Sequence, residues 1–201
     1  GYRHLMRWVT AAQGAAAGGT PRTDLAQASE WGGEIIALAG HPDGALARML
    51  LNRDLDGALR YVTPRRAAFG PDHFFLMVQD HGPPRDRRLR AAMARLSEHS
   101  GIPRVATQDV HYLDRRQAPA QDVLACLRQH RTLADTHRHR LATPEYDFKS
   151  GAAMAALFPG EEALLERAAE IAGRCEFDPE LGRLEFAQYP RPPGRDLHTA
   201  L

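Results

Sequence analysis

Residues 104–113, RVATQDVHYL, join a short apolar run to two side chains that can bind a metal ion. The stretch predicts a β-strand, with Asp109 and His111 near its end. Residues two positions apart in an extended chain point to the same side, so the carboxylate and the imidazole would converge. Such oxygen and nitrogen ligands suit Zn, Mn or Fe. The alternative is that Asp109 caps the next turn and His111 packs at the end of the strand.

Two further apolar runs, residues 34–40 and 73–79, predict strands of the same kind. Apolar residues at helical spacing follow them, over residues 44–62 with a possible break near 52–54, and over residues 85–99. Strands that are apolar rather than alternating, and that helices separate, predict parallel pairing with both sheet faces buried. We therefore expect an α/β fold, a fragment of a β/α barrel with parallel strands and outer helices. Three strands are too few to close a barrel, so the missing strands should precede Gly1.

His41 directly follows the strand expected at residues 34–40. In barrels of parallel strands, reactive groups gather at the C-terminal ends of the strands. His41 would then lie at the same end of the sheet as Asp109 and His111, and imidazole is an ordinary ligand of the metals named above. The alternative is a loop histidine beside Pro42 that has no role.

The region after the third expected strand is typical of helices. Residues 114–129 predict a helix whose core side carries Val123, Leu124 and Leu127. Further helices are expected up to residue 177. Residues 178–195, which are rich in Pro, Gly and Arg, then indicate a linker.

Arginine dominates the basic side chains of this chain. Of the 26 basic residues only Lys149 is a lysine, so 25 are arginine. GC-rich coding would explain this bias. A phosphate-binding surface would also explain it, because the planar guanidinium group of arginine can bind a phosphate with two hydrogen bonds. The net charge of +1 does not by itself predict an electrostatic nucleic-acid surface.

The two cysteines, Cys126 and Cys175, lie far apart and form no motif. Cys126 falls in an apolar helical pattern and is expected to be a buried thiol. This cysteine usage fits a reducing cytosol better than a disulfide scaffold, so we expect a cytoplasmic protein. There is no signal peptide and no run near the roughly 18 apolar residues of a membrane span, so no membrane contact is expected. The start at Gly1 and the stop at Leu201 indicate an internal piece of a longer protein.

Several blocks of the chain, in their order and spacing, closely resemble one protein family. These blocks are residues 105–141 (VATQDVHYLDRRQAPAQDVLACLRQHRTLADTHRHRL), 148–158 (FKSGAAMAALF), 168–178 (AAEIAGRCEFD), 69–84 (FGPDHFFLMVQDHGPP), 33–41 (GEIIALAGH) and 1–10 (GYRHLMRWVT). The sequence is similar to the last part of the N-terminal PHP (polymerase and histidinol phosphatase) domain of bacterial replicative DNA polymerase III alpha subunits. The resemblance covers nearly the whole chain and is weakest over residues 11–30.

The resemblance implies a division of the chain and a set of metal ligands. Residues 1–113 would be a partial PHP-type β/α barrel, residues 114–177 its helical end, and residues 178–201 a linker towards the polymerase palm. The implied ligands are Asp109, His111 and His41, the last at a position where the family often carries a cysteine ligand.

The chain also departs from the family pattern. Met77 stands where the family commonly has Glu, so either the site is partly degraded or that Glu was structural. His81 and the glycine after it match the family's His-Gly, and we expect Asp80 and His81 first as loop residues and second as ligands. His137 and His139 form an H-x-H, but the family's H-x-H metal motif belongs at the start of the domain, so a solvated loop is expected here.

A complete PHP site resembles a trinuclear metal cluster that hydrolyses phosphoesters. In some replicative polymerases this chemistry is proofreading, and in others the site has decayed and the domain binds a separate proofreading exonuclease. The resemblance therefore implies divalent Zn, Mn or Fe in a site that this segment holds only in part, and Mg in a polymerase site outside the chain. The implied partners are DNA, the rest of the polymerase chain, an exonuclease subunit and the sliding clamp. The segment alone should hold metal poorly and be nearly inert, and no catalytic residue is assigned to it.

The leading hypothesis is thus a segment of a replicative DNA polymerase III alpha subunit, a DNA-directed DNA polymerase. Three alternatives stay open. The first is a stand-alone PHP phosphoesterase such as a histidinol phosphatase, which would not need the extension at residues 114–195. The second is a metal-free PHP module that docks a proofreading exonuclease. The third is an error-prone relative of the polymerase.

Overall fold

The computed structural model describes residues 1–16, 19–135, 140–178 and 182. Within these residues the chain is a mixed α/β protein with one parallel sheet of three strands. The strands are β1 (Ala37–Ala39), β2 (Phe74–Val78) and β3 (Arg104–Ala106). The α-helices are α1 (Tyr2–Gly14), α2 (Leu25–Trp31), α3 (Ala45–Leu51), α4 (Leu55–Phe69), α5 (Pro84–Ser100), α6 (Ala118–Arg128), α7 (Gly151–Leu157) and α8 (Glu162–Gly173). Two short 3-10 helices are η1 (Gly32–Glu34) and η2 (Arg115–Gln117).

The sheet has the strand order β1-β2-β3, with β2 in the centre and every pair parallel. Leu38 lies opposite Phe75, and Met77 lies opposite Val105. The expected parallel pairing is therefore confirmed. The described residues contain three strands and no closed barrel, so the PHP-type barrel and the division at residues 113 and 177 stay predictions.

The third strand is shorter than the sequence predicts. We expected it over residues 104–113, but β3 ends at Ala106. The physical reason is that β2 ends at Val78, whose carbonyl accepts a hydrogen bond from Thr107 at 2.9 Å, so the chain beyond has no β2 residues beside it. It pairs instead with a later segment, where the backbone N–H of His111 donates to the carbonyl of Tyr146 at 2.8 Å.

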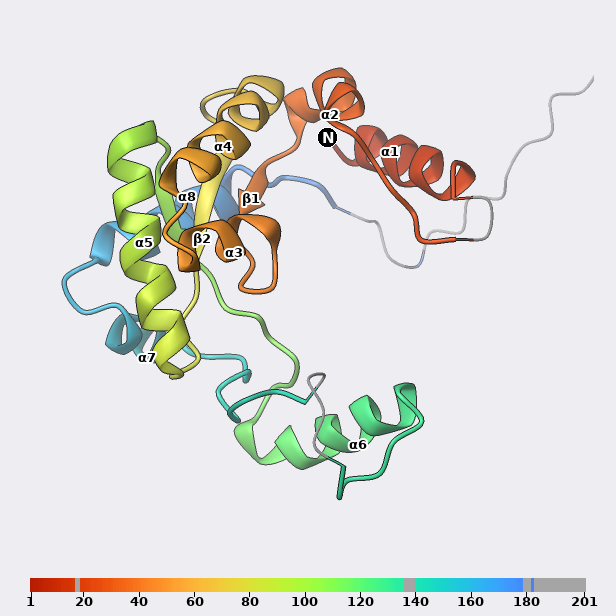
Figure 1. Cartoon of the computed structure of the whole chain (residues 1–201), viewed down its shortest axis with the longest axis vertical. Helices are drawn as coiled ribbons and strands as arrows, with labels where there is room; N and C mark the ends of the chain where they lie inside the picture. Colours follow the sequence, from red (N-terminus) through yellow and green to blue (C-terminus); the bar gives the residue numbers. More distant parts are fainter. Residues whose placement is uncertain (17–18, 136–139, 179–181, 183–201) are drawn as a thin grey trace, which may run out of the picture.

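The central strand carries the core of the protein. Phe74, Leu76 and Val78 are each at most 2% exposed and belong to one apolar cluster with residues of α3, α4 and α5. These three helices lie over the sheet in Figure 1, and α8 packs beside β3. Because β2 is buried at every position except the partly buried Met77, its sequence is an apolar run rather than an alternation of apolar and polar residues.

The helix expected over residues 44–62 breaks where the sequence suggested. Arg53 adopts a left-handed backbone with φ of 62°, which ends α3. Asp54 then caps α4, because its Oδ1 accepts a hydrogen bond from the backbone N–H of Gly57 at 2.8 Å. A Cβ at Gly57 would meet the Asp54 carboxylate at 2.0 Å, so a larger residue there would require the Asp54 side chain to shift.

The prediction for the apolar side of α6 is wrong. Val123, Leu124 and Leu127 are 41%, 60% and 66% exposed, although we expected them in the core. In Figure 1, α6 extends away from the sheet, so within the described residues its leucine-rich side does not reach the core. Cys126 lies on another side of the helix and is buried, as predicted.

Other predictions fall outside the described residues. His137 and His139 are among them, and so is nearly all of the linker expected at residues 178–201. Within the part of the chain that the structure describes, no helix is both long and apolar enough to cross a bilayer.

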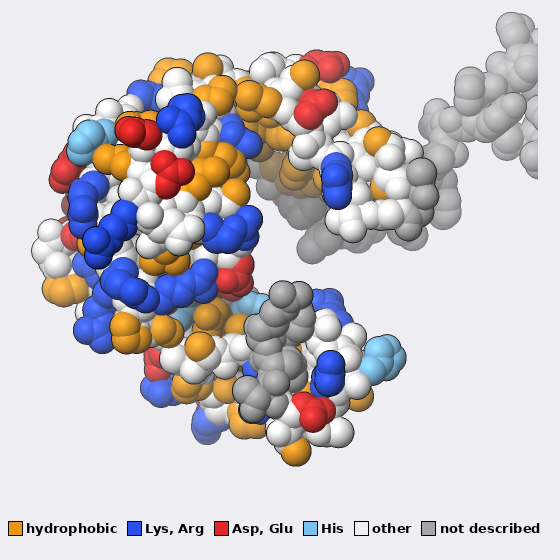
Figure 2. Space-filling model, in the orientation of Figure 1, with side chains coloured by type: hydrophobic (Ala, Val, Ile, Leu, Met, Phe, Trp, Pro, Cys, Tyr) orange, Lys and Arg blue, Asp and Glu red, His pale blue; other side chains and the backbone are white. Residues whose placement is uncertain are grey.

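Most of the charged side chains on the visible face belong to arginines (Figure 2). Arg90 of α5 differs from an ordinary solvated arginine, because it is hydrogen-bonded to other parts of the protein. Arg90 Nε donates to Glu161 Oε2 at 2.6 Å, and its Nη1 donates to the carbonyl of Leu157 at 2.9 Å. Arg104 Nη1 of β3 donates to the other Glu161 oxygen at 2.7 Å. Glu161 thus joins the segment between α7 and α8 to α5 and β3.

The charge state of Glu161 follows from these contacts. Burial raises the pKa of Glu161, but the hydrogen bonds and positive charges of Arg104 and Arg90 outweigh burial, so the net pKa lies below its ordinary value of 4.5. The carboxylate is therefore ionised at neutral pH, and its ionised form is the one that stabilises the fold.

We predict that Glu161→Gln lowers the free energy of unfolding by about 2 kcal/mol at pH 7, because two partly buried guanidinium groups lose their anion. Urea unfolding followed by circular dichroism measures this loss. Because the folded pKa is lowered, the stabilisation is present above pH 4.5 and fades as the pH falls through the folded pKa. The exposed Glu166 provides a control, since Glu166→Gln should change stability by no more than about 0.5 kcal/mol. Equal effects of the two substitutions would contradict the bridging role.

Candidate functional site

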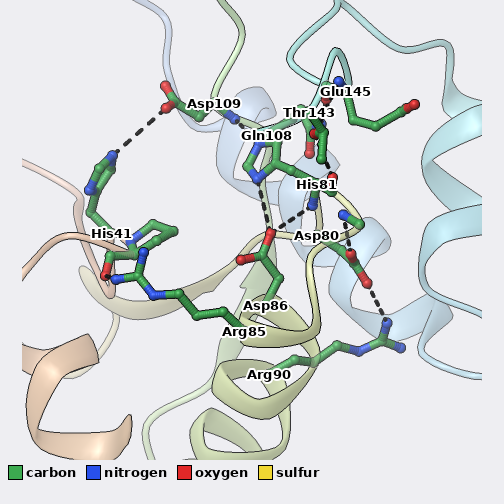
Figure 3. Close-up of polar contacts among 12 residues, drawn as sticks. His41, Asp80, His81, Arg85, Asp86, Arg90, Gln108, Asp109, Thr143 and Glu145 are labelled. Atoms are coloured by element: carbon green, nitrogen blue, oxygen red, sulfur yellow. Dashed lines mark hydrogen bonds and ion pairs between the residues drawn. The ribbon is translucent and has the colours of Figure 1, made fainter. Parts of the chain in front are cut away.

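The candidate site lies where the three parallel strands end. His41 follows β1, His81 follows β2, and Asp109 and His111 follow β3. Because the strands are parallel and adjacent, the loops after them meet at one edge of the sheet. Figure 3 shows His41, His81 and Asp109 facing this common region.

The structure brings the three predicted metal ligands together. His41 Nε2 lies 3.8 Å from Asp109 Oδ2, and His111 Nε2 lies 3.2 Å from the same oxygen. All three side chains are partly exposed, with Asp109 35% exposed. The prediction that Asp109 and His111 converge is confirmed, although they do so on a loop rather than on a strand.

The donor set has the right chemistry for a metal but is not a complete site. Two imidazoles and one carboxylate are ordinary ligands of Zn, Mn or Fe. Over residues 1–16, 19–135, 140–178 and 182, however, no group of three or more His, Cys, Asp or Glu side chains is arranged so that it could hold a metal ion. Both imidazole nitrogens face the carboxylate oxygen itself.

His81 is the residue whose importance the sequence reasoning underestimated. Its side chain is 1% exposed, and its backbone N–H donates to Asp86 Oδ2 at 2.9 Å. Its Nε2 accepts a hydrogen bond of 3.4 Å from the backbone N–H of Asp109, which requires the neutral tautomer with the proton on Nδ1. Nδ1 lies 3.4 Å from Asp86 Oδ2, within ion-pair distance but without hydrogen-bond geometry. His81 therefore connects the end of β2 to the loop that carries Asp109.

Two pKa shifts describe the electrostatics beneath the site. Burial raises the pKa of Asp86, but its hydrogen bonding with His81 and the positive charge of Arg85 outweigh burial, so the net pKa lies below the ordinary 3.8. Burial, together with the negative charges of Asp86 and Asp109, raises the pKa of Tyr146 to about 12. Tyr146 is thus a neutral phenol at neutral pH, and Asp86 is a carboxylate.

A segment far along the chain completes the floor of the site. The Tyr146 ring stacks on His81 with ring centroids 4.0 Å apart, and it meets the His111 ring edge-on at 5.6 Å. Thr143 Oγ1 donates to the carbonyl of His81 at 2.8 Å, and Gln108 Nε2 donates to the carbonyl of Glu145 at 2.6 Å. No local sequence pattern at residues 143–146 indicates that they contact the segments after β2 and β3.

Met77 occupies an interior position of β2, where it lies opposite Val105 and is partly buried. The nearest carboxylate that follows Met77 in the chain is Asp80, in the loop after β2. Its Oδ1 accepts a hydrogen bond from the backbone N–H of Gly82 at 2.9 Å. Asp80 Oδ2 also lies 3.8 Å from Arg90 Nη1. Asp80 is therefore held as a loop residue, which agrees with the first of the two roles expected for it.

We compared the chain with known proteins. It matches no family model. It is similar to the DNA polymerase III subunit alpha of Treponema pallidum, with 34% identity over 87% of this chain and 15% of that protein. The protein of the same name from Saccharopolyspora erythraea is 34% identical over 67% of this chain and 11% of its own length. That from Thermus aquaticus is 29% identical over 97% of this chain and 16% of its own length. The chain therefore spans only about a sixth or less of the length of these relatives.

We predict that His81→Ala lowers the free energy of unfolding by about 3 kcal/mol, because it removes a buried ring and leaves the Asp86 carboxylate with fewer partners. Urea unfolding at pH 7 measures the loss. The exposed His99 supplies a matched control, and His99→Ala should cost no more than about 0.5 kcal/mol. A loss for His81→Ala as small as the control's would show that the buried ring does not hold the loops together.

Proposed function

Because the chain belongs to the DNA polymerase III alpha subunit family, of which it spans one segment, we propose that the whole protein is a DNA-directed DNA polymerase that acts in DNA replication. The observation that carries this proposal is the similarity over 87% and 97% of the chain to two alpha subunits. The palm carboxylates and the Mg²⁺ that nucleotide transfer requires would belong to other parts of that protein.

Within the polymerase, this segment would be the C-terminal part of a PHP-type domain for metal-dependent phosphoester hydrolysis. His41, Asp109 and His111 meet at the ends of parallel strands, which is where the reactive groups of such folds gather. A metal bound there would supply a hydroxide from water and stabilise the charge of a phosphoryl group. The remaining ligands would come from parts of the protein outside residues 1–201.

The residues of this chain have separate roles in the proposed site. His41 and His111 would bind the metal through imidazole nitrogens, and Asp109 through its carboxylate. His81 would position Asp109 by accepting the hydrogen bond from its backbone N–H. Tyr146, neutral at physiological pH, would orient His111 through the contact between their rings.

A second candidate function is a metal-free module that docks a proofreading exonuclease. It is favoured by the finding that the described residues hold no complete metal-binding group. A stand-alone phosphoesterase is less well supported, because the match to the Thermus aquaticus subunit extends over 97% of the chain. For the whole protein we propose DNA, the sliding clamp and an exonuclease subunit as partners, and the cytoplasm as its location.

The polymerase proposal is tested with the product of the full reading frame that encodes this chain. We predict that it extends a primed DNA template in the presence of Mg²⁺ and stops when the metal is chelated, because nucleotide transfer depends on metal-held phosphates. Residues 1–201 expressed alone, as a control, should add no nucleotide. Absence of primer extension by the full product would overturn the proposal.

The metal proposal is tested on the same full product by elemental analysis. We predict that Zn, Mn or Fe is bound, and that the double substitution Asp109→Ala/His111→Ala removes at least about half of it, because two ligands are lost. His99→Ala, at an exposed histidine away from the loops of the site, should leave the metal content unchanged. Equal metal content in the double variant and the unsubstituted protein would favour the metal-free docking module.

A further inference from the structure

A pocket of 460 Å³ lies between the end of α3, the start of α4 and the middle of α5. None of His41, Asp109 and His111 lines it, so it is separate from the site at the strand ends. Among the residues that the structure describes, leucine and alanine side chains form its apolar floor, and three arginines are the polar side chains around it. The residues on which the inference rests are Leu50, Leu55, Ala92, Arg53, Arg88 and Arg95.

The three arginines carry positive charge that the protein does not neutralise. Arg53, Arg88 and Arg95 are all exposed. Within the residues that the structure describes, their guanidinium groups have no hydrogen-bond or ion-pair partner. Other arginines of the same helix differ, since Arg85 pairs with Asp43 at 3.2 Å and Arg90 pairs with Glu161. Figure 2 shows basic side chains gathered on the face that α3 and α5 present.

The pocket combines two chemical features that together restrict its ligand. Its apolar floor stabilises apolar side chains by removing them from water. Its rim attracts negative charge, and the planar guanidinium groups can bind carboxylates with two hydrogen bonds each. A free phosphate would use the rim and leave the floor empty. The ligand that uses both features carries carboxylates and apolar side chains on one surface.

A nucleic acid fits the lining less well than a peptide does. Single strands bind proteins by stacking bases on aromatic side chains, and none of the described residues that line this pocket is aromatic. Apart from the three arginines, the described lining residues are leucines and alanines, whose side chains cannot hydrogen-bond to the edge of a base. The positive charge alone would attract a phosphate backbone, but it would leave the leucines of the floor uncovered.

The geometry of α5 indicates the form of the ligand. Arg88, Ala91, Ala92 and Arg95 are spaced i, i+3, i+4 and i+7, so they form one strip about 10 Å long on the helix. This is the length of two turns of a second helix laid alongside. We propose that this pocket binds an acidic amphipathic segment of a partner protein, with its leucine-type side chains on the floor and its carboxylates against the three arginines. The proposal does not depend on the polymerase assignment.

Fluorescence anisotropy with a dye-labelled peptide tests the proposal on the product of the full reading frame that encodes this chain. The probe is a helical peptide of about four turns, with Leu on one side and Glu on its flanks. We expect the acidic peptide to bind, and the double substitution Arg88→Glu/Arg95→Glu to weaken its affinity at least about tenfold. The affinity should fall as the salt concentration rises, because both arginines are exposed. Circular dichroism checks that the variant is folded.

Matched controls separate this site from a general attraction of charges. Arg3→Glu/Arg7→Glu reverses the same number of exposed charges on α1 and should leave the affinity within about twofold, because those residues lie outside the pocket. A second peptide with Lys in place of each Glu should not bind. The proposal is overturned if the α1 variant loses as much affinity as the pocket variant. It is overturned equally if the acidic peptide does not bind, or if single-stranded oligodeoxythymidine binds this pocket more tightly than the peptide does.

Discussion

The placement of β2 between two parallel strands is the constraint on which the rest of this structure depends. Phe74, Leu76 and Val78 bury one face of the strand against α3, α4 and α5, and the backbone of the strand holds β1 and β3 in register. Since all three strands run the same way, the loops that follow them must meet at one edge. The proximity of His41 to Asp109 follows from this arrangement rather than from any local pattern.

The C-terminal third of the described chain is joined to the sheet by apolar packing, with Phe158 and Leu164 buried in the core, and by polar contacts. Glu161 binds Arg90 and Arg104, while Thr143 and Tyr146 contact His81 beneath the site. Partly buried charges and hydrogen bonds of this kind specify one arrangement, because each group would be costly to bury without its partner. The contacts of Thr143 and Tyr146 with His81 therefore help to set the geometry of the loops near Asp109.

Two groups of arginines in this protein differ in burial and in whether an acidic side chain neutralises them. Arg90 and Arg104 are partly buried and neutralised by Glu161, so they stabilise the fold. Arg53, Arg88 and Arg95 are exposed around an apolar pocket and keep their charge available to a ligand. A net charge of +1 conceals this difference, because the distribution of charge over the surface, and not its sum, determines what binds.

The sequence by itself determined the parallel α/β arrangement, the break between α3 and α4, and the pairing of Asp109 with His111. These features depend on residues close together in the chain, through apolar runs, capping side chains and, for Asp109 and His111, a separation of only two residues. Only the tertiary structure decided that β3 ends at Ala106, that the leucines of α6 are exposed, and that His81 is buried against Tyr146. Each of these depends on which distant segment lies alongside, and hydrophobic periodicity carries no information about the identity of that neighbour.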